Sequence, residues 1–234
     1  MKLSTPIYRL KRQARLLSRK EGIPLHEALD RLAVQEGFRA WSHLSQELGA
    51  SAPAAKLFAQ LQPGNLLLVA ARPGQGKTLL ALEIAVEAAR SGHRSMFFSL
   101  EATENDCQRL LLSIGVEPES LQGRFVFDGS DSICASYVIT QLTDAPRGTL
   151  VVIDYLQLLD QRRDTDPLET QVRSLKTFAK ERGLIVVFIS QIHRSFDPAT
   201  KPVPEMEDIR LPNPLDLKLF DRACFLHDGE LRFA

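Results

Sequence analysis

Apolar residues along this 234-residue chain recur with two periods, one typical of buried strands and one typical of amphipathic helices. Short apolar runs that predict strands lie at 66–71, 95–100, 150–154 and 184–190, with a shorter candidate at 124–127. Segments of helical period alternate with them, at 79–90, 103–114, 131–142 and 167–182. This alternation predicts an α/β fold with a mainly parallel central sheet flanked by helices.

The end of the chain carries the pattern of a β-hairpin. Residues 222–227 and 230–233 have strand-like patterns and flank Asp228-Gly229, a dipeptide typical of two-residue hairpin turns. We therefore expect these two strands to form an antiparallel pair.

Residues 1–48 differ from the rest of the chain, because their pattern predicts helices only. The expected helices span 6–20, 25–36 and 38–48, with Gly22 and Gly37 as their stops. We expect Trp41 to lie at the centre of a small core. Residues 49–57, which begin Gly-Ala-Ser-Ala-Pro-Ala-Ala, are interpreted as a linker to a second domain at 58–234.

Charge is unevenly distributed, although the net charge of the whole chain is zero. The first twenty residues contain no acid and seven cations, Lys2, Arg9, Lys11, Arg12, Arg15, Arg19 and Lys20. A basic arm of this kind favours nucleic acid or an acidic partner surface, and a solvated helix face is an equal alternative. The helical pattern fits either a helix-turn-helix unit or a collar that docks on a neighbouring subunit.

Cysteine spacing and hydropathy bear on the cellular compartment. Cys107, Cys134 and Cys224 lack metal-ligand spacing and are interpreted as core thiols of a reducing compartment. The N-terminus lacks the apolar stretch of a secretory leader, and no apolar run approaches membrane length. We therefore expect a cytoplasmic protein without a membrane partner.

The run from 66 to 90 predicts a phosphate-binding loop, since a buried strand is followed by a glycine-rich turn and then a helix beginning with Lys-Thr. In such a loop Lys77 would reach the β- and γ-phosphates of a nucleoside triphosphate, and the Thr78 hydroxyl would hold Mg²⁺. Ala71 stands where the loop pattern asks for glycine. The expected nucleotide-binding residues are Arg72, Pro73, Gly74, Gln75, Gly76, Lys77, Thr78 and Leu79.

Three further polar residues follow predicted strands, where ligands bind in open α/β sheets. Asp154 is a candidate to hold the Mg²⁺ shell together with Thr78, with a strand-end acid that caps a turn as the alternative interpretation. Glu101 is a candidate base for the attacking water, with a helix N-terminal acid as the alternative interpretation. Gln191 is a candidate sensor of the γ-phosphate. With Lys77, these residues form the expected catalytic set.

Five segments in a fixed order together closely resemble the RecA-like motor domain of DnaB-type replicative helicases, over about residues 58–227. They are Ala-Ala-Arg-Pro-Gly-Gln-Gly-Lys-Thr at 70–78, Phe-Ser-Leu-Glu at 98–101, Val-Ile-Asp-Tyr-Leu-Gln-Leu at 152–158, Arg-Ser-Leu-Lys-Thr-Phe-Ala-Lys at 173–180 and Ile-Ser-Gln-Ile-His-Arg at 189–194. The resemblance implies a RecA-like P-loop ATPase with Mg²⁺ and ATP at the residues above. The pattern of this family allows alanine at the position of Ala71.

The resemblance also implies two loops that hold single-stranded DNA, at 159–170 and 193–216. Their candidate DNA-binding residues are Arg162, Arg163, Arg194, Lys201 and Arg210, the last within Asp208-Ile209-Arg210, which resembles the family's Asp-Leu-Arg. Homo-oligomers, hexamers in this family, are implied as well.

The chain also departs from the family pattern. About 48 residues stand where the family has a larger helical domain. These N-terminal helices are a candidate binding site for a protein partner. Leu-Pro-Asn-Pro-Leu-Asp-Leu-Lys at 211–218 replaces a Glu-Ser-Gly-type turn, and no Lys-x-Arg element follows the hairpin. We therefore expect a slow ATPase with weak self-association.

Two functions remain open at this point. The first is a DnaB-like, helicase-type ATPase that hydrolyses ATP and acts on single-stranded DNA. The second is a KaiC-like, ATP-gated binding module or accessory ATPase without helicase activity. Stimulation of ATP hydrolysis by DNA would separate them.

Overall fold

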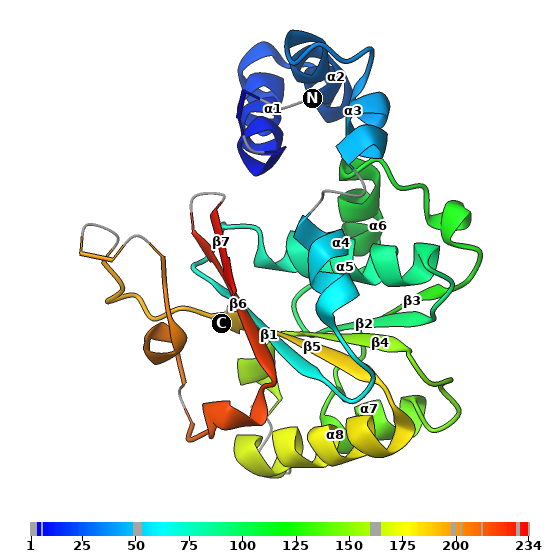
Figure 1. The fold of residues 1–234 in the computed structure, drawn as a ribbon, viewed down its shortest axis with the longest axis vertical. Helices are drawn as coiled ribbons and strands as arrows, with labels where there is room; N and C mark the ends of the chain where they lie inside the picture. Colours follow the sequence, from blue (N-terminus) through cyan, green and yellow to red (C-terminus); the bar gives the residue numbers. More distant parts are fainter. Residues whose placement is uncertain are drawn as a thin grey trace.

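The computed structural model describes residues 4–5, 7–48, 53–159, 165–197, 200–201, 203–211, 213–227 and 230–233. Within them, seven strands form one sheet, in the order β3-β2-β4-β5-β1-β6-β7 (Figure 1). The strands are β1 (Leu66–Ala71), β2 (Ser95–Ser99), β3 (Phe125–Asp128), β4 (Leu150–Asp154), β5 (Ile185–Gln191), β6 (Arg222–His227) and β7 (Glu230–Phe233). Every neighbouring pair is parallel except β6 and β7, which confirms both the parallel sheet and the antiparallel C-terminal pair.

Helices cover both faces of this sheet (Figure 1). One face packs against α4 (Pro53–Gln60), α5 (Lys77–Arg90) and α6 (Glu104–Ser113), and the other against α7 (Ala135–Gln141) and α8 (Leu168–Arg182). Leu67 and Val69 of β1 belong to the α5 side, whereas Leu66 and Leu68 belong to the α8 side. Successive side chains of a strand point to opposite faces, so a central strand between two helical layers must be apolar throughout.

Residues 7–48 form a small bundle of α1 (Ile7–Glu21), α2 (Leu25–Gln35) and α3 (Trp41–Leu48) with a core of its own. Its core contains Leu10, Ala14, Leu29, Trp41 and Leu44, and the Trp41 residue is only 4% exposed. Trp41 therefore lies in the core of this bundle, as the pattern predicts. Lys11 of α1 forms an ion pair with Glu83 of α5, which joins the bundle to the helix after the phosphate-binding loop.

Residues 53–57, predicted as part of a linker, instead begin α4. Leu57 is 1% exposed and Ala54 2% exposed, both in the cluster with α5. Burial of such side chains stabilises a fold by about 1.5–3 kcal/mol for each leucine, which outweighs the flexible composition of this segment. Residues 49–52 of the predicted linker lie outside the described part.

Two smaller predictions also need correction. The helix predicted from 131 begins at Ala135, because Asp128 and Ser130 accept hydrogen bonds from the N–H groups of Ser130 and Ser132 and hold a turn there. Cys134 is only partly buried, since it precedes α7 near the surface, whereas Cys107 and Cys224 are buried as expected.

Candidate nucleotide-binding site

The parallel register brings the ends of four strands to one edge of the sheet. Ala71 of β1 lies opposite Gln191 of β5, and Ser99 of β2 lies opposite Asp154 of β4. Glu101 follows Ser99 by two residues. The glycine-rich loop, Glu101, Asp154 and Gln191 therefore gather at the carboxyl edge, where parallel sheets bind their ligands.

The loop after β1 has the backbone that an anion cradle needs. Gly74 and Gly76 have φ angles of 78° and 92°, in the left-handed region that favours glycine. A Cβ built on either glycine would meet no atom within 4 Å, so the space beside the loop is open. α5 begins at Lys77, and the N–H groups of its first turn have no partner within the helix.

Other loop residues differ in what they can offer a phosphate. The side chains of Lys77 and Thr78 are partly exposed, whereas Leu79 is buried and offers only its main-chain N–H group. The N–H of Gln75 donates to the carbonyl of Arg72 at 3.3 Å, which closes the turn through Pro73.

Thr78 and Asp154 meet directly beneath the loop. Thr78 Oγ1 donates to Asp154 Oδ2 at 3.1 Å, and Asp154 is only 3% exposed. Burial raises the pKa of the Asp154 carboxyl to about 6, and the Thr78 hydrogen bond and the charge of Lys77 oppose that rise. The other oxygen, Asp154 Oδ1, is buried without a hydrogen-bond partner among the described residues.

An unpartnered buried carboxylate oxygen beside a hydroxyl is a fitting place for a hard cation, because Mg²⁺ binds through carboxylate, hydroxyl and water oxygens. The open glycine loop next to it fits the phosphates that such a cation accompanies. The residues present therefore fit Mg²⁺ together with a nucleoside triphosphate. No group of three or more His, Cys, Asp or Glu with the geometry of a separate metal centre occurs among the described residues.

Glu101 is placed by the turn after β2. Ser99 Oγ accepts hydrogen bonds from the N–H groups of Glu101 at 3.2 Å and Ala102 at 2.9 Å. The Glu101 side chain is exposed and close enough to Asp154 to raise its pKa. The acids in the first turn of α6 are Glu104 and Asp106, and Thr103 is its N-cap, so Glu101 is not a helix N-terminal acid.

Gln191 ends β5, and residues 208–210 lie against it. Ile192 and Ile209 form an antiparallel bridge, and the N–H of Arg210 donates to the carbonyl of Gln191 at 2.8 Å. Arg210 Nη1 also donates to Gln191 Oε1 at 3.4 Å. Arg210 therefore lies on its loop directly beside the candidate sensor.

Gln157 and Ser99 are two supporting residues to which sequence reasoning assigned no role. Gln157 is 7% exposed, and its Nε2 donates to Ser190 Oγ at 2.8 Å and to the carbonyl of Arg210 at 2.6 Å. It thereby joins the segment after β4 to β5 and to the loop that carries Arg210. The sequence feature that could have indicated a role for Gln157 is its position as the one amide among the leucines at 156–159.

The remaining candidate DNA-binding residues have different surroundings. Arg194 is exposed after β5, whereas Lys201 forms ion pairs with Glu205 at 2.7 Å and Asp208 at 3.1 Å. Glu205 also accepts from Arg232 of β7 at 2.5 Å. Arg162 and Arg163 lie outside the described residues.

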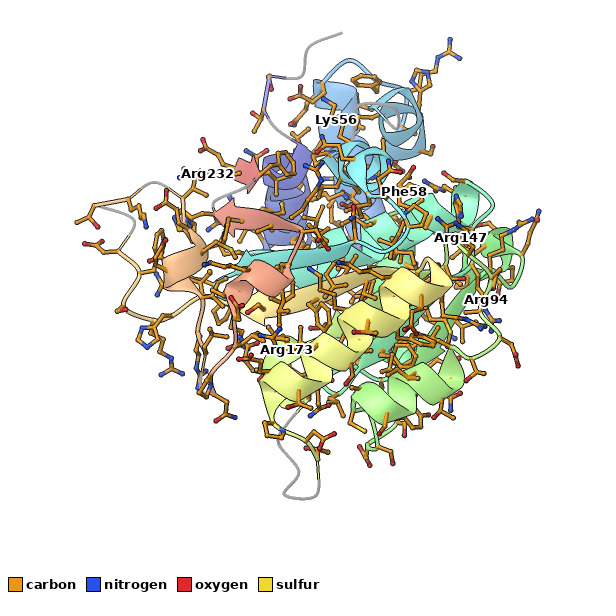
Figure 2. All side chains as sticks on the ribbon, turned by 60° about the horizontal axis from the view of Figure 1, so that its bottom comes forward. Lys56, Phe58, Arg94, Arg147, Arg173 and Arg232 are labelled. Atoms are coloured by element: carbon orange, nitrogen blue, oxygen red, sulfur yellow. The ribbon has the colours of Figure 1, made fainter. Side chains whose placement is uncertain are left out.

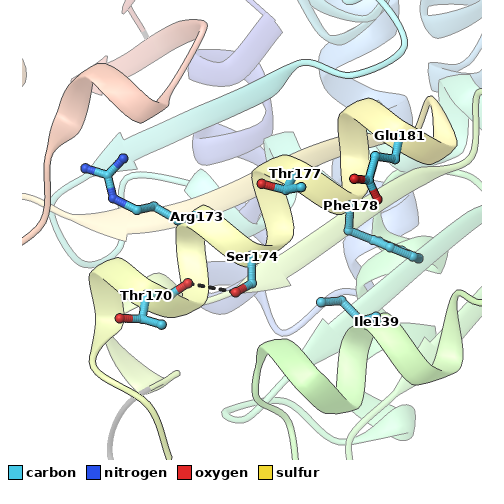
Figure 3. Close-up of a pocket in the computed structure, with 7 residues that line it drawn as sticks. All are labelled: Ile139, Thr170, Arg173, Ser174, Thr177, Phe178 and Glu181. Carbon is cyan, nitrogen blue, oxygen red and sulfur yellow. Dashed lines mark hydrogen bonds between the residues drawn. The ribbon is translucent and has the colours of Figure 1, made fainter.

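A separate open depression lies between α7 and α8, on a helical face rather than at the strand ends. Figure 3 shows Phe178 and Ile139 pointing towards it, with Ser174 Oγ hydrogen-bonded to the carbonyl of Thr170 at 3.0 Å. None of the candidate nucleotide-binding residues lines it, so we do not assign it to the nucleotide.

Comparison with known proteins identifies the fold and the family. The family "DnaB-like helicase C terminal domain" matches residues 54–126 and 134–216, which together make up most of the chain. The chain belongs to this family. Among solved structures, this DnaB-like chain is similar to that of an ATPase domain, with a TM-score of 0.62 and 21% identity, covering 79% of this chain and 80% of that one. The RecA-like fold is thereby confirmed.

The curated relatives of this DnaB-like chain are longer proteins. The replicative DNA helicase DnaB of Leifsonia xyli subsp. xyli is 28% identical over 181 residues, covering 64% of this chain and 40% of the relative. The replicative DNA helicase DnaB of Mycoplasma genitalium is 27% identical over 202 residues, covering 71% of this chain and 43% of the relative. The chain thus spans about two fifths of the length of these relatives.

A second solved structure extends the comparison. A DnaB-like replicative helicase, described with its interactions with primase, matches with a TM-score of 0.59 and 21% identity, covering 93% of this chain and 65% of that one.

Among the described residues, no helix of this DnaB-like chain has the length and apolar character needed to cross a membrane.

Proposed function

We propose that this chain is an ATP-hydrolysing, helicase-type motor domain that binds ATP with Mg²⁺ and acts on single-stranded DNA. The observation that carries the proposal is the hydrogen bond from Thr78 to the buried Asp154, with the unpartnered Asp154 Oδ1, beneath an open glycine loop. Family membership supports the same conclusion and lends no support to an ATP-gated binding module.

Each residue of the loop would have a distinct task. The N–H groups at the start of α5 would bind phosphate oxygens, and Lys77 would neutralise charge on the β- and γ-phosphates. Thr78 and Asp154 would hold Mg²⁺, which, when bound, supplies positive charge to the developing negative charge of the phosphates. The raised pKa of the Asp154 carboxyl reflects the unfavourable free energy of a buried negative charge, which a bound cation would offset.

Glu101 and Gln191 would act on the hydrolysis step. Glu101 would accept a proton from a water whose oxygen bonds to the γ-phosphorus as the bond to the β–γ bridging oxygen breaks, which yields ADP and phosphate. Gln191 would contact the γ-phosphate while it is present. The contact between Gln191 and Arg210 offers a route from the nucleotide to the loop 193–216.

DNA would bind along the loops after β4 and β5. Arg194 and Arg210 are exposed in the described part of that region, and Arg162 and Arg163 belong to the first loop by sequence. Homo-oligomer formation, as hexamers by family resemblance, would place these loops around a strand, and the N-terminal bundle is the candidate site for a protein partner. We propose a cytoplasmic location for this activity.

The test is the rate of ATP hydrolysis with and without single-stranded DNA, together with the mass measured with a non-hydrolysable ATP analogue. We expect hydrolysis that DNA accelerates and that Lys77→Ala abolishes. ATP binding without any hydrolysis, or hydrolysis that DNA does not change, would overturn the proposal.

A further inference from the structure

Helix α1 carries a basic face that neither the nucleotide site nor the strand-end loops use. Residues 7–21 contain a single acid, Glu21, and six cations, Arg9, Lys11, Arg12, Arg15, Arg19 and Lys20. Glu21 is itself paired with Arg31 of α2 at 2.7 Å. The helix therefore has five more positive than negative charges, and Glu21 is already paired with a cation of α2.

The arginines face away from the core of the bundle. Leu10 and Ala14 are buried, and at about 100° per residue Arg12, Arg15 and Arg19 fall within about 60° of one another on the opposite side. All three are exposed, and Leu16 beside them is 58% exposed. For Arg15 and Arg19, no carboxylate among the described residues lies within ion-pair distance.

An ion pair with α5 helps to set how this face is presented. Lys11 and Glu83 of α5 form an ion pair with side chains only 12% and 15% exposed. The bundle core around Trp41 and this ion pair together place α1 beside α5. The contact uses the flank of α1 and leaves the arginine face open.

We propose that this face of α1 is a docking surface for the phosphate backbone of duplex DNA, separate from the proposed single-strand site. Residues 12 to 19 span about 10 Å of helix, which corresponds to about three base-pair steps along a duplex axis at about 3.4 Å each. Single-strand sites normally add several aromatic side chains for base stacking, and α1 contains a single aromatic residue, Tyr8. A rigid row of cations suits the regular phosphate row of a duplex.

The proposal does not depend on ATP hydrolysis, so duplex binding is measured without nucleotide. Fluorescence anisotropy of a labelled duplex is recorded with the full chain at about 50 and 200 mM salt. The test variant is the pair Arg15→Gln and Arg19→Gln. The matched control is the pair Arg94→Gln and Arg147→Gln, exposed arginines at the amino ends of β2 and β4, away from α1 (Figure 2).

We expect the test pair to weaken duplex binding about tenfold or more and to reduce the salt slope by nearly two, at about 0.9 for each phosphate that the protein no longer neutralises. The control pair should leave the slope unchanged. An equal loss of affinity in both pairs, or an unchanged slope in the test pair, would overturn the proposal. A drop in oligomer mass with an unchanged slope would likewise overturn it and favour the docking collar.

The variant Lys77→Ala separates this proposal from the proposed function. It should lose ATP hydrolysis and keep duplex binding with its full salt slope. Loss of duplex binding in Lys77→Ala would count against an independent surface on α1, whereas absent hydrolysis in the wild type would overturn only the proposed function.

Discussion

The guanidinium of Arg210 donates to the side-chain oxygen of Gln191, from Nη1 to Oε1 at 3.4 Å, and its main-chain N–H donates to the Gln191 carbonyl at 2.8 Å. Nineteen residues separate the two in sequence. The contact places a candidate DNA-binding residue directly on the candidate γ-phosphate sensor. Gln157 strengthens the arrangement, since its amide donates to the Arg210 carbonyl.

We expect this contact to couple DNA binding to hydrolysis. Arg210→Ala and Gln191→Ala should each reduce the DNA-stimulated ATPase rate, and the double variant should lose less than the two effects combined. Contacting pairs of this kind show coupling of about 1 kcal/mol, or roughly fivefold in rate. A double-mutant cycle of DNA-stimulated rates measures it, and strictly additive effects would show that the contact carries no coupling.

Glu101 should prove to be the residue on which the hydrolysis step depends. Glu101→Gln keeps the size of the side chain and removes its basicity, so we expect retained ATP binding with hydrolysis reduced by about 10²–10⁴. Glu104→Gln is the matched control, because it changes an exposed acid in the first turn of α6. Wild-type hydrolysis by Glu101→Gln would rule out the base assignment.

The buried charge of Asp154 should destabilise the ligand-free protein at neutral pH. Burial raises the pKa of this carboxyl from 3.8 to about 6, so the folded state binds more protons than the unfolded state between these values. The wild type should therefore lose up to about 3 kcal/mol of stability as the pH rises from about 4 to 6.

Asp154→Asn removes that loss, and it should also prevent hydrolysis. Thermal unfolding is measured without nucleotide or Mg²⁺ from pH 4 to 8. The unfolding temperature of the variant should rise relative to that of the wild type as the pH rises. Parallel curves across this range would contradict an energetically costly buried charge.

Glu205 should restrain the cation of Lys201. The carboxylate of Glu205 pairs with both Lys201 and Arg232, and the Glu205 hydrogen bond raises the Lys201 pKa. Glu205→Gln should therefore tighten binding of single-stranded DNA, because Arg232 loses its carboxylate partner and Lys201 keeps only that of Asp208, so both cations become more available to phosphates. Glu207→Gln is the matched control, a neighbouring exposed acid.

Anisotropy with a labelled single strand measures both variants. We expect tighter binding and a steeper salt dependence for Glu205→Gln, beyond any change in Glu207→Gln. Equal changes in the two variants would mean that only net charge matters and that the Glu205 pairs do not restrain this loop.

Local patterns identified most of the fold and the nucleotide loop. Strands buried on both faces must be apolar throughout, and Lys77-Thr78 after a glycine turn is a pattern specific to phosphate binding. Gln157 and Ser99 were missed because their roles depend on partners that sequence distance hides. The start of α4 was missed because Ala54 and Leu57 gain their stability from burial against α5, not from local preference.

The sequence by itself determined the alternation of strands and helices, the phosphate loop, the polar residues at the strand ends and the basic character of α1. These depend on periodicity and on chemistry close along the chain. Only the tertiary structure showed the direct hydrogen bond from Thr78 to Asp154, the contact of Arg210 with Gln191 and the pairing of Lys201 with acids. Sheet register and loop closure bring those groups together, and side-chain partners 76 or 19 residues apart leave no local pattern from which to predict them.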